Sequence, residues 1–373
     1  MVMKKLIDQI LAPAFMMASL IIGAGMFSLP YVFARSGVIA GTIYLILMAL
    51  VAIEVHRSYA EVIEAGGEGH RFAGYAAKYL GKGGELAGGA AVIGGIIMTL
   101  TIYLTLSTSF ISLIFPSVPG FAAALTFWVF GSAMIAVGIR KFAGLDTIFF
   151  LGIVAITLAV MVFGALFGDG NILTLRPTDL SGIFLPLAPI LFSLSGRSAI
   201  SSMKEYFTEK KYDRKNFIRA IVLGTLIPAF VYIAFVFGVT ALSPQGVTTD
   251  AVSGLSHLPF VFLYAAGVLG FFAIITSYVF LGMELRGILE KDMRMKHILA
   301  LSVSIILPAV LYFSGFNNFI FLIGFVGGVF LAFESIIVIM MRRVATLRRR
   351  PHDFILVSVF LAAMIYEVVI FIK

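Results

Sequence analysis

The sequence predicts an all-α polytopic membrane protein that crosses the bilayer eleven times. Hydrophobic residues make up 61% of the 373 residues, only 12% are charged, and the mean hydropathy is +1.07. Soluble domains of this length are far more polar, and apolar runs of about twenty residues match the thickness of a bilayer. The length of these runs also excludes a β-barrel, whose strands show about ten residues of alternating polarity.

The expected spans follow one another through connections too short to hold a soluble domain. They cover residues 9–34, 38–60, 85–114, 120–139, 145–167, 180–207, 216–242, 259–289, 297–313, 319–341 and 354–372. Between the second and third spans, residues 68–82 place Phe72, Tyr75, Ala76 and Tyr79 at helical spacing. This pattern predicts a short amphipathic helix with a structural role on the cytoplasmic side.

The net charge of +8 follows from membrane orientation and does not indicate a nucleic-acid partner. With the spans above, all but four of the 27 Lys and Arg residues lie on one side. The exceptions are Arg35, Arg176 and Lys373 on the opposite side and Arg197 inside a span. Basic residues collect on the cytoplasmic side, so Lys4 and Lys5 place the amino terminus in the cytoplasm, and we expect a multi-pass protein of the cytoplasmic membrane. The chain has no cysteine, which excludes disulfides and thiolate metal sites.

Two spans are interrupted at corresponding places. Residues 21–30, IIGAGMFSLP, break the first span, and residues 192–200, FSLSGRSAI, break the sixth. Glycine and serine at this density make poor helix interiors, and a membrane tolerates unwound backbone only where protein or a watery cavity satisfies its polar groups. A matched pair of interruptions is typical of the substrate site of a secondary transporter.

The positions of the breaks predict an internal repeat. Broken first and sixth spans imply two units of five spans, residues 9–167 and 180–341, followed by an extra helix at 354–372. Because five is odd, the second unit enters the membrane from the opposite side, which makes the repeat inverted. We therefore expect residues 1–373 to form one transmembrane transporter domain.

The broken helices themselves provide the expected binding groups. The free N–H groups at one helix end suit a carboxylate, and the free carbonyls at another suit a cation, so the pair describes a pocket for a zwitterion. Small residues that allow a ligand to approach the backbone are Gly23, Ala24 and Gly25 in the first break and Ser195, Gly196 and Ser198 in the second. The alternative is that Gly-x-Gly only permits close helix packing. Tyr103, Thr105 and Phe192 are candidates to line the substrate's side chain, with ordinary packing as the alternative.

The eighth span carries a candidate ion site. Thr276 and Ser277, with Ala273 three residues earlier, place hydroxyl and carbonyl oxygens at one depth on one helix. Such oxygen ligands suit Na⁺, completed by carbonyls from the break in the first span. The alternative is that both hydroxyls bond back to carbonyls of their own helix, as Ser and Thr often do.

Arg197 is the most unusual residue, because an arginine inside a membrane is expensive and normally faces a cavity or a carboxylate. Three interpretations stay open: it binds an anionic group of the substrate, it supplies a fixed positive charge in place of an ion, or it pairs structurally with Glu334 or Glu54. Glu334 lies deep in the tenth span, where a carboxyl group can carry a proton. Glu54 is only three residues from Arg57 and is expected nearer the interface.

The motifs at these positions resemble those of a known family. The run IIGAGMFSLPYVFARSG resembles the first helix of amino-acid permeases of the amino acid/polyamine/organocation superfamily, especially the hydroxy and aromatic amino acid permeases, the tryptophan/tyrosine permease group. Further similar stretches are IEVHRS in the second span, FSLSGRSAISSMKEY in the sixth and FFAIITSYVFLGMELRGILEKD in the eighth. The resemblance covers nearly the whole chain in order and spacing.

The resemblance implies the LeuT-type five-plus-five inverted-repeat fold, with substrate between spans one, three, six and eight and with alternating access. It implies that Gly23, Ala24 and Gly25 hold the substrate carboxylate, that carbonyls of Ser193 to Gly196 hold its amino group, and that Tyr103 borders the pocket.

The resemblance also bears on ion coupling. Ala273, Thr276 and Ser277, with carbonyls near Leu20 and Gly23, match the sodium site of sodium-coupled relatives, whereas the hydroxy and aromatic permeases are mostly regarded as proton-coupled. Arg197 departs from the small or neutral residue usual at its position.

The function expected is therefore ion-coupled symport of an amino acid across the cytoplasmic membrane, driven by Na⁺ or H⁺, with no other cofactor. The alternatives are an amino-acid exchanger, a carrier of an amino-acid-like anion, a transport-derived amino-acid sensor, or a channel. An intramembrane enzyme is not expected, because the five histidines are predicted to lie scattered near membrane edges without forming a metal cluster. The expected partners are the amino-acid substrate and the lipid bilayer.

Overall fold

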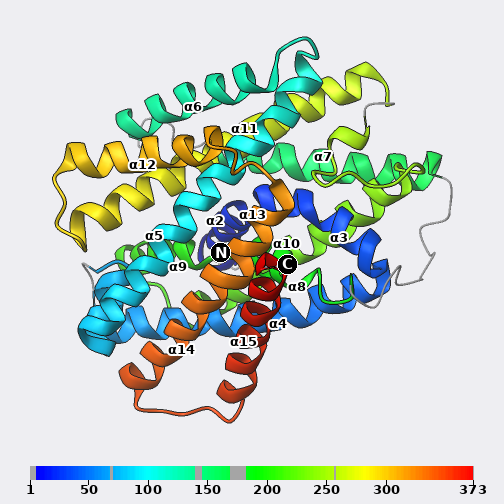
Figure 1. Ribbon diagram of the computed structural model, residues 1–373. Helices are drawn as coiled ribbons and strands as arrows, with labels where there is room; N and C mark the ends of the chain where they lie inside the picture. The colour runs from blue at the N-terminus through cyan, green and yellow to red at the C-terminus, as the bar shows by residue number, and fades with distance from the viewer. Residues whose placement is uncertain (1–5, 68–69, 139–144, 169–181, 256–257, 373) are drawn as a thin grey trace.

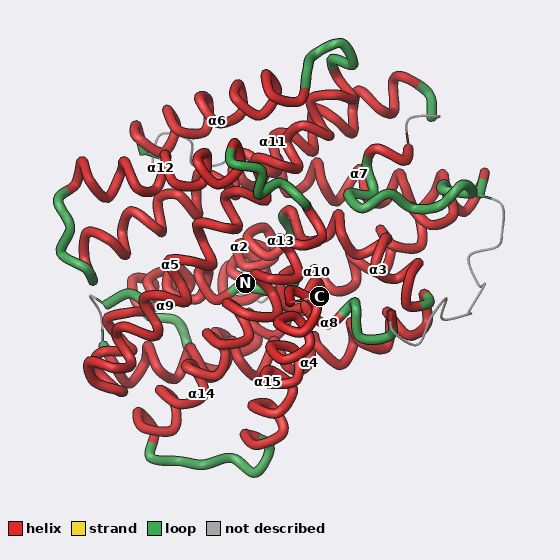
Figure 2. The backbone as a smooth tube through the Cα atoms, viewed as in Figure 1, coloured by secondary structure: helices red, strands yellow, loops and turns green. Residues whose placement is uncertain are grey.

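A computed structural model describes residues 6–67, 70–138, 145–168, 182–255 and 258–372. The described part of the chain is helical and contains no strand (Figure 2). Lys4, Lys5, Arg176, Lys373 and the predicted start of the sixth span at 180–181 lie outside the described residues.

The helices of the first half match the predicted spans closely. The first span consists of a π-helical turn η1 (Ile7–Leu11), α2 (Ala12–Ile21), a 3₁₀ segment η2 (Ala24–Ser28) and α3 (Leu29–Ser36). It is followed by α4 (Val38–Gly66), α5 (Phe72–Ile114), α6 (Gly120–Val137) and α7 (Leu145–Phe167). The halves of the first span, Ile7–Ile21 and Ala24–Ser36, are bent by 53° at the predicted break.

The second half repeats the pattern, again with its first span broken. The sixth span is divided into α8 (Leu187–Ser193) and α9 (Arg197–Lys210). Then come α10 (Arg214–Ala241), the short 3₁₀ turn η6 (Ser253–Leu255), α11 (Phe260–Lys291), α12 (His297–Phe313), α13 (Phe319–Phe325), the π-helical η7 (Val326–Leu331), α14 (Ala332–Thr346) and α15 (Asp353–Ile372). In the described residues, seven helical segments are long and apolar enough to cross a bilayer, and the bent first pair forms a further span.

The predicted amphipathic helix between the second and third spans is present as the first part of α5. Gly81 has φ 71° and ψ −165°, so it interrupts the helix and separates this part from the membrane span. Such a conformation favours glycine, because a Cβ would be strained there. Phe72, Tyr75 and Ala76 are buried, and the Tyr75 hydroxyl donates to the Gly67 carbonyl at 2.7 Å.

The broken helices lie at the centre of the molecule. Figure 1 shows α2 and α13 near the middle, with α6, α7 and α12 towards the periphery. All residues of η2 and most of α8 are buried, whereas large apolar side chains such as Phe121 on α6 and Ile298 on α12 are exposed. Exposed apolar side chains on peripheral helices fit a lipid surround, and the protein is a multi-pass membrane protein.

Candidate functional site at the two helix breaks

A pocket of about 730 Å³, including the part open to solvent, lies where the two breaks meet. Elements α2, η2, α5, α8, α9, α11, η7 and α14 all contribute to its walls. The predicted site residues that line it are Leu20, Gly23, Ala24, Gly25, Tyr103, Phe192, Ser195, Arg197, Ser277 and Glu334. The predicted residues Ser193, Gly196, Ala273 and Thr276 are not among the residues that line it, and Thr105 lines a separate cavity.

The break in the first span is packed directly against the break in the sixth. Ile22 is extended at φ −73° and ψ 96°, and the helix resumes after Gly23. A Cβ on Gly25 would lie 2.6 Å from both Cα and Oγ of Ser193, and one on Gly23 would lie 2.7 Å from the Tyr103 hydroxyl. Each glycine permits close packing and also lines the pocket, so the packing alternative and the predicted position at the pocket are compatible.

The break in the sixth span is held by a histidine of the second span. The Gly196 N–H donates to His56 Nε2 at 3.1 Å, and His56 Nδ1 lies 3.0 Å from the Thr225 hydroxyl. Thr225 in turn donates to the Ile221 carbonyl at 2.9 Å. A neutral ring protonated on Nδ1 satisfies all three contacts. His56 is 3% exposed, so it is buried between the second span and the break of the sixth.

One tyrosine joins the carbonyl ends of both half-helices. The Tyr232 hydroxyl on α10 lies 2.8 Å from the Ile21 carbonyl at the end of α2 and 2.8 Å from the Ser193 carbonyl at the end of α8. The hydroxyl has one hydrogen, so it donates to either carbonyl in turn. The sequence did not single out Tyr232, and the only signal was a polar tip within an apolar span, since a buried tyrosine hydroxyl usually has a partner.

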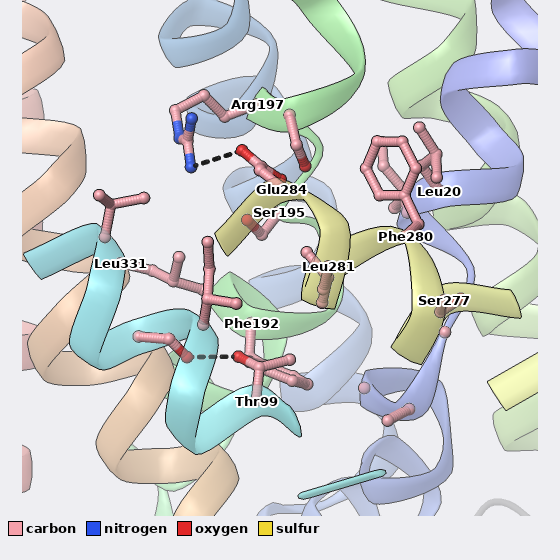
Figure 3. A pocket seen from close by; sticks show the side chains of 18 of the residues that line it. Leu20, Thr99, Phe192, Ser195, Arg197, Ser277, Phe280, Leu281, Glu284 and Leu331 are labelled. Carbon is pink, nitrogen blue, oxygen red and sulfur yellow. Dashed lines mark hydrogen bonds and ion pairs between the residues drawn. The ribbon is translucent and has the colours of Figure 1, made fainter. Parts of the chain in front are cut away.

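Arg197 lies at the pocket in a buried ion cluster. Its Nε donates to Glu334. Its Nη2 lies 3.6 Å from Glu284 Oε1 (Figure 3). Its guanidinium carbon also lies 4.7 Å from the Phe72 ring centroid and 5.6 Å from that of Tyr59. Arg197, Glu334 and Glu284 are 9%, 5% and 7% exposed.

The pairing of Arg197 with Glu334 is one of the three predicted interpretations, whereas Glu54 pairs with Arg350 and Arg57. Sequence reasoning missed Glu284. It lies seven residues after Ser277, so two helical turns place both on one face of α11.

The predicted ion-site residues of α11 adopt the alternative arrangement. The Thr276 and Ser277 hydroxyls lie 3.0 Å and 3.3 Å from the Ala273 carbonyl of their own helix. Ser277 still faces the break of the first span, because its Oγ lies 3.7 Å from a Cβ placed on Gly23. The Ser277 hydroxyl is therefore the predicted ion-site oxygen of α11 that lies beside this break.

Comparison with known proteins adds the family. The sequence model of the tryptophan/tyrosine permease family matches residues 7–372. A comparison with curated protein sequences finds no match. Among solved structures, the crystal structure of MhsT in complex with L-phenylalanine is similar with a TM-score of 0.66 and 15% sequence identity, covering 96% of this chain and 97% of that chain. The predicted LeuT-type fold is confirmed. The chain belongs to the tryptophan/tyrosine permease family and is a secondary amino-acid transporter.

Proposed function

We propose that the protein carries an aromatic L-amino acid across the cytoplasmic membrane into the cytoplasm by symport with Na⁺ or H⁺. The observation that carries this proposal is a single pocket lined by both helix breaks and by aromatic and aliphatic side chains.

The backbone at the breaks provides the groups for a zwitterion. Ala24 and Gly25 begin η2, and the first N–H groups of a helical segment lack partners within it, so they suit the substrate carboxylate. The carbonyls of Ile21 and Ser193 end the opposing half-helices. A carbonyl oxygen has two lone pairs, so the carbonyl of Ile21, which lines the pocket, can accept from the substrate ammonium in addition to Tyr232.

The side-chain region of the pocket supports an aromatic substrate. Phe192, Phe280, Leu281 and Tyr103 line it, and the family is named for tryptophan and tyrosine. MhsT, which shares the fold, was crystallised with L-phenylalanine. Arg197 offers little attraction to an anionic side chain, because two carboxylates already face it. An anion carrier is therefore less well supported.

Two sets of residues are candidates for the coupling ion. The oxygens of Ala273, Thr276 and Ser277, with the backbone of Leu20 and Gly23, have the chemistry that Na⁺ prefers. The carboxyl groups beside Arg197, among them the sequence-predicted Glu334, have the chemistry for a proton. The distribution of Lys and Arg supports an amino terminus in the cytoplasm.

Uptake into proteoliposomes tests this function. Radiolabelled L-tryptophan, L-tyrosine, L-phenylalanine, L-alanine and L-aspartate are offered under an imposed Na⁺ gradient, an imposed pH gradient, or neither. We expect saturable accumulation of the aromatic amino acids under at least one gradient, and none in protein-free liposomes. Preferred accumulation of L-aspartate would support the anion carrier, and exchange without accumulation would support the exchanger. Binding without flux would support a sensor, and current without saturable flux a channel.

A further inference from the structure

One carboxylate oxygen at the pocket has no partner in the structure. Glu284 is 7% exposed, lines the pocket, and its Oε2 is fully buried with no hydrogen-bond partner among the described residues. Its other oxygen lies 3.6 Å from Arg197 Nη2, which is an ion pair without a hydrogen bond. A buried carboxylate oxygen left in this way is unfavourable unless something binds it.

The charges of the cluster do not balance. The pocket is lined by one guanidinium, Arg197, and by two carboxylates, Glu334 and Glu284. Glu334 makes the closer contact, through Arg197 Nε, so Arg197 and Glu334 form the compensated pair. Glu284 is then the surplus negative charge, and it also carries the unpartnered oxygen.

The other groups near the cluster form no second ion pair with Glu284 among the described residues. Tyr59 and His56 face it from α4, and His56 is a neutral acceptor for Gly196 N–H. Phe72 faces the cluster from α5. Further along α5, Tyr103 contacts Ser277, which lies two helical turns before Glu284 on α11. Arg71 is a further cation one helical turn along α11, where its Nε lies 3.2 Å from a Cβ placed on Gly287.

We propose that Glu284 binds the transported proton and is the coupling carboxylate of this permease. This inference rests on the proposed function and assigns a residue to it. The proton adds to Oε2 and converts the carboxylate to a carboxylic acid, and it leaves to water on the cytoplasmic side. With the proton bound, the cluster consists of the neutral pair Arg197–Glu334 and a neutral acid.

A proton suits this position better than a metal cation. Na⁺ requires several oxygen ligands, and the guanidinium 3.6 Å from Glu284 Oε1 would repel it. A proton needs only one oxygen. The described residues also contain no group of three or more His, Cys, Asp or Glu side chains arranged to hold a metal.

The location of Glu284 explains how its charge affects the transport cycle. Arg197 is the first residue of α9, the cytoplasmic half of the broken sixth span, and Glu284 lies on α11. Ionised Glu284 attracts Arg197 and so holds α9 towards α11. Protonation removes that attraction at the same pocket that binds the substrate. The proton and the substrate thereby both affect the movement of α9 relative to α11.

The test compares wild type with Glu284→Gln, which keeps the size and polarity of the side chain but cannot ionise. Proteoliposomes containing a pH-sensitive dye are given L-tryptophan, and three quantities are measured: accumulation under a pH gradient, acidification of the lumen, and counterflow exchange. We expect Glu284→Gln to lose accumulation and acidification while it retains counterflow. Glu290→Gln, on the same helix but beside His297 at its cytoplasmic end, is the matched control and should retain all three.

Three outcomes would overturn the inference. Accumulation under a pH gradient by Glu284→Gln would show that the proton binds elsewhere. Loss of L-tryptophan binding by a folded Glu284→Gln would make Glu284 a ligand for the substrate ammonium. Wild-type uptake driven by Na⁺ but not by pH would remove proton coupling and leave the proposed function intact, whereas a wild type inactive under every gradient would remove the function itself.

A further measurement tests the proposal even if Glu284→Gln fails to fold. In weakly buffered solution, wild type should take up protons when L-tryptophan binds, and Glu284→Asp, which still ionises, should retain this uptake. Binding without proton uptake by wild type would contradict the proposal irrespective of any variant.

Discussion

Two arginine clusters are buried in this protein, and they are built in opposite ways. At the junction of α14 and α15, Arg342 donates to both oxygens of Asp353 at 2.5 Å and 2.6 Å. Arg343 Nε and the Arg350 N–H add contacts of 3.0 Å each to the same carboxylate. At the pocket, one guanidinium serves two carboxylates, and a carboxylate oxygen remains without a partner.

On the proposal made above, the difference separates a structural ion pair from one that takes part in transport. The Asp353 carboxylate is saturated with donors, and the unsatisfied atoms of this cluster are donors, because Arg342 Nε and Nη1 are buried without a hydrogen-bond partner among the described residues. The Arg197 cluster has a surplus of negative charge and lies on the surface of the pocket. Burial of an arginine alone therefore does not indicate a functional site. The balance of hydrogen-bond donors and acceptors around the arginine is the more informative property.

The largest effect is expected from Arg197→Ala. The change leaves Glu334 and Glu284 buried together without a cation, and removing one partner of a buried pair costs about 3–5 kcal/mol. We expect loss of L-tryptophan uptake and a lower free energy of unfolding, measured in detergent by thermal or denaturant unfolding. Arg348→Ala, at an exposed arginine, is the control. A variant as stable and active as wild type would show that the cluster contributes nothing to either property.

Arg342→Ala is expected to affect stability alone. It leaves Asp353, which is 2% exposed, with the partly exposed Arg343 as its remaining cationic side chain, and we expect destabilisation of about 3 kcal/mol. The KM for L-tryptophan of the folded protein should stay at the wild-type value, because Arg342 and Asp353 do not line the pocket. A raised KM with unchanged stability would erase the distinction between the two clusters.

Gly25→Ala tests whether L-tryptophan binding at the pocket depends on the close packing of the two helix breaks. The new methyl group would lie 2.6 Å from Ser193 Cα and 3.0 Å from Phe192, so the broken helices must move apart, and overpacking of this kind costs about 1–3 kcal/mol. We expect weaker L-tryptophan binding, measured by equilibrium binding. Gly83→Ala is the control, because a Cβ there meets no atom within 4 Å. Equal affinity in both variants would mean that the close contact between the breaks has no role in binding.

The smallest effect is expected from Tyr232→Phe. The loss of the hydroxyl leaves the carbonyls of Ile21 and Ser193 without this donor, and a net hydrogen bond contributes about 0.5–1.5 kcal/mol. We expect a small decrease in thermal stability with a measurable loss of L-tryptophan affinity. Tyr264→Phe, at an exposed tyrosine of α11, should change neither. If both substitutions behave alike, the bridge between the half-helices is not a stabilising contact.

Most of the fold was predictable because it depends on local composition. The apolar runs predicted the helices from α2 to α15 with small shifts of their ends, and glycine and serine at 23–25 and 195–198 predicted both breaks. These features follow from the length of a hydrophobic segment and from the poor helix propensity of its interrupting residues. The family resemblance, carried by motifs at the breaks, agreed with the family match.

The partners at the site were less predictable, because they come from spans far apart in the chain. Three of these partners are single polar residues within apolar helices, namely Glu284, His56 and Tyr232. The sequence alone does not indicate which charged residue or which helix break each of them contacts. Thr276 and Ser277 carried two possible hydrogen-bonding arrangements, and the sequence held both open.

By itself, the sequence determined a helical membrane protein with two matched breaks, since hydrophobic length and helix-breaking residues act locally. Only the tertiary structure decided which buried charges compensate one another. That balance depends on distances between α9, α11 and α14, across 137 residues from Arg197 to Glu334, and electrostatic energy in a buried site changes steeply with such distances.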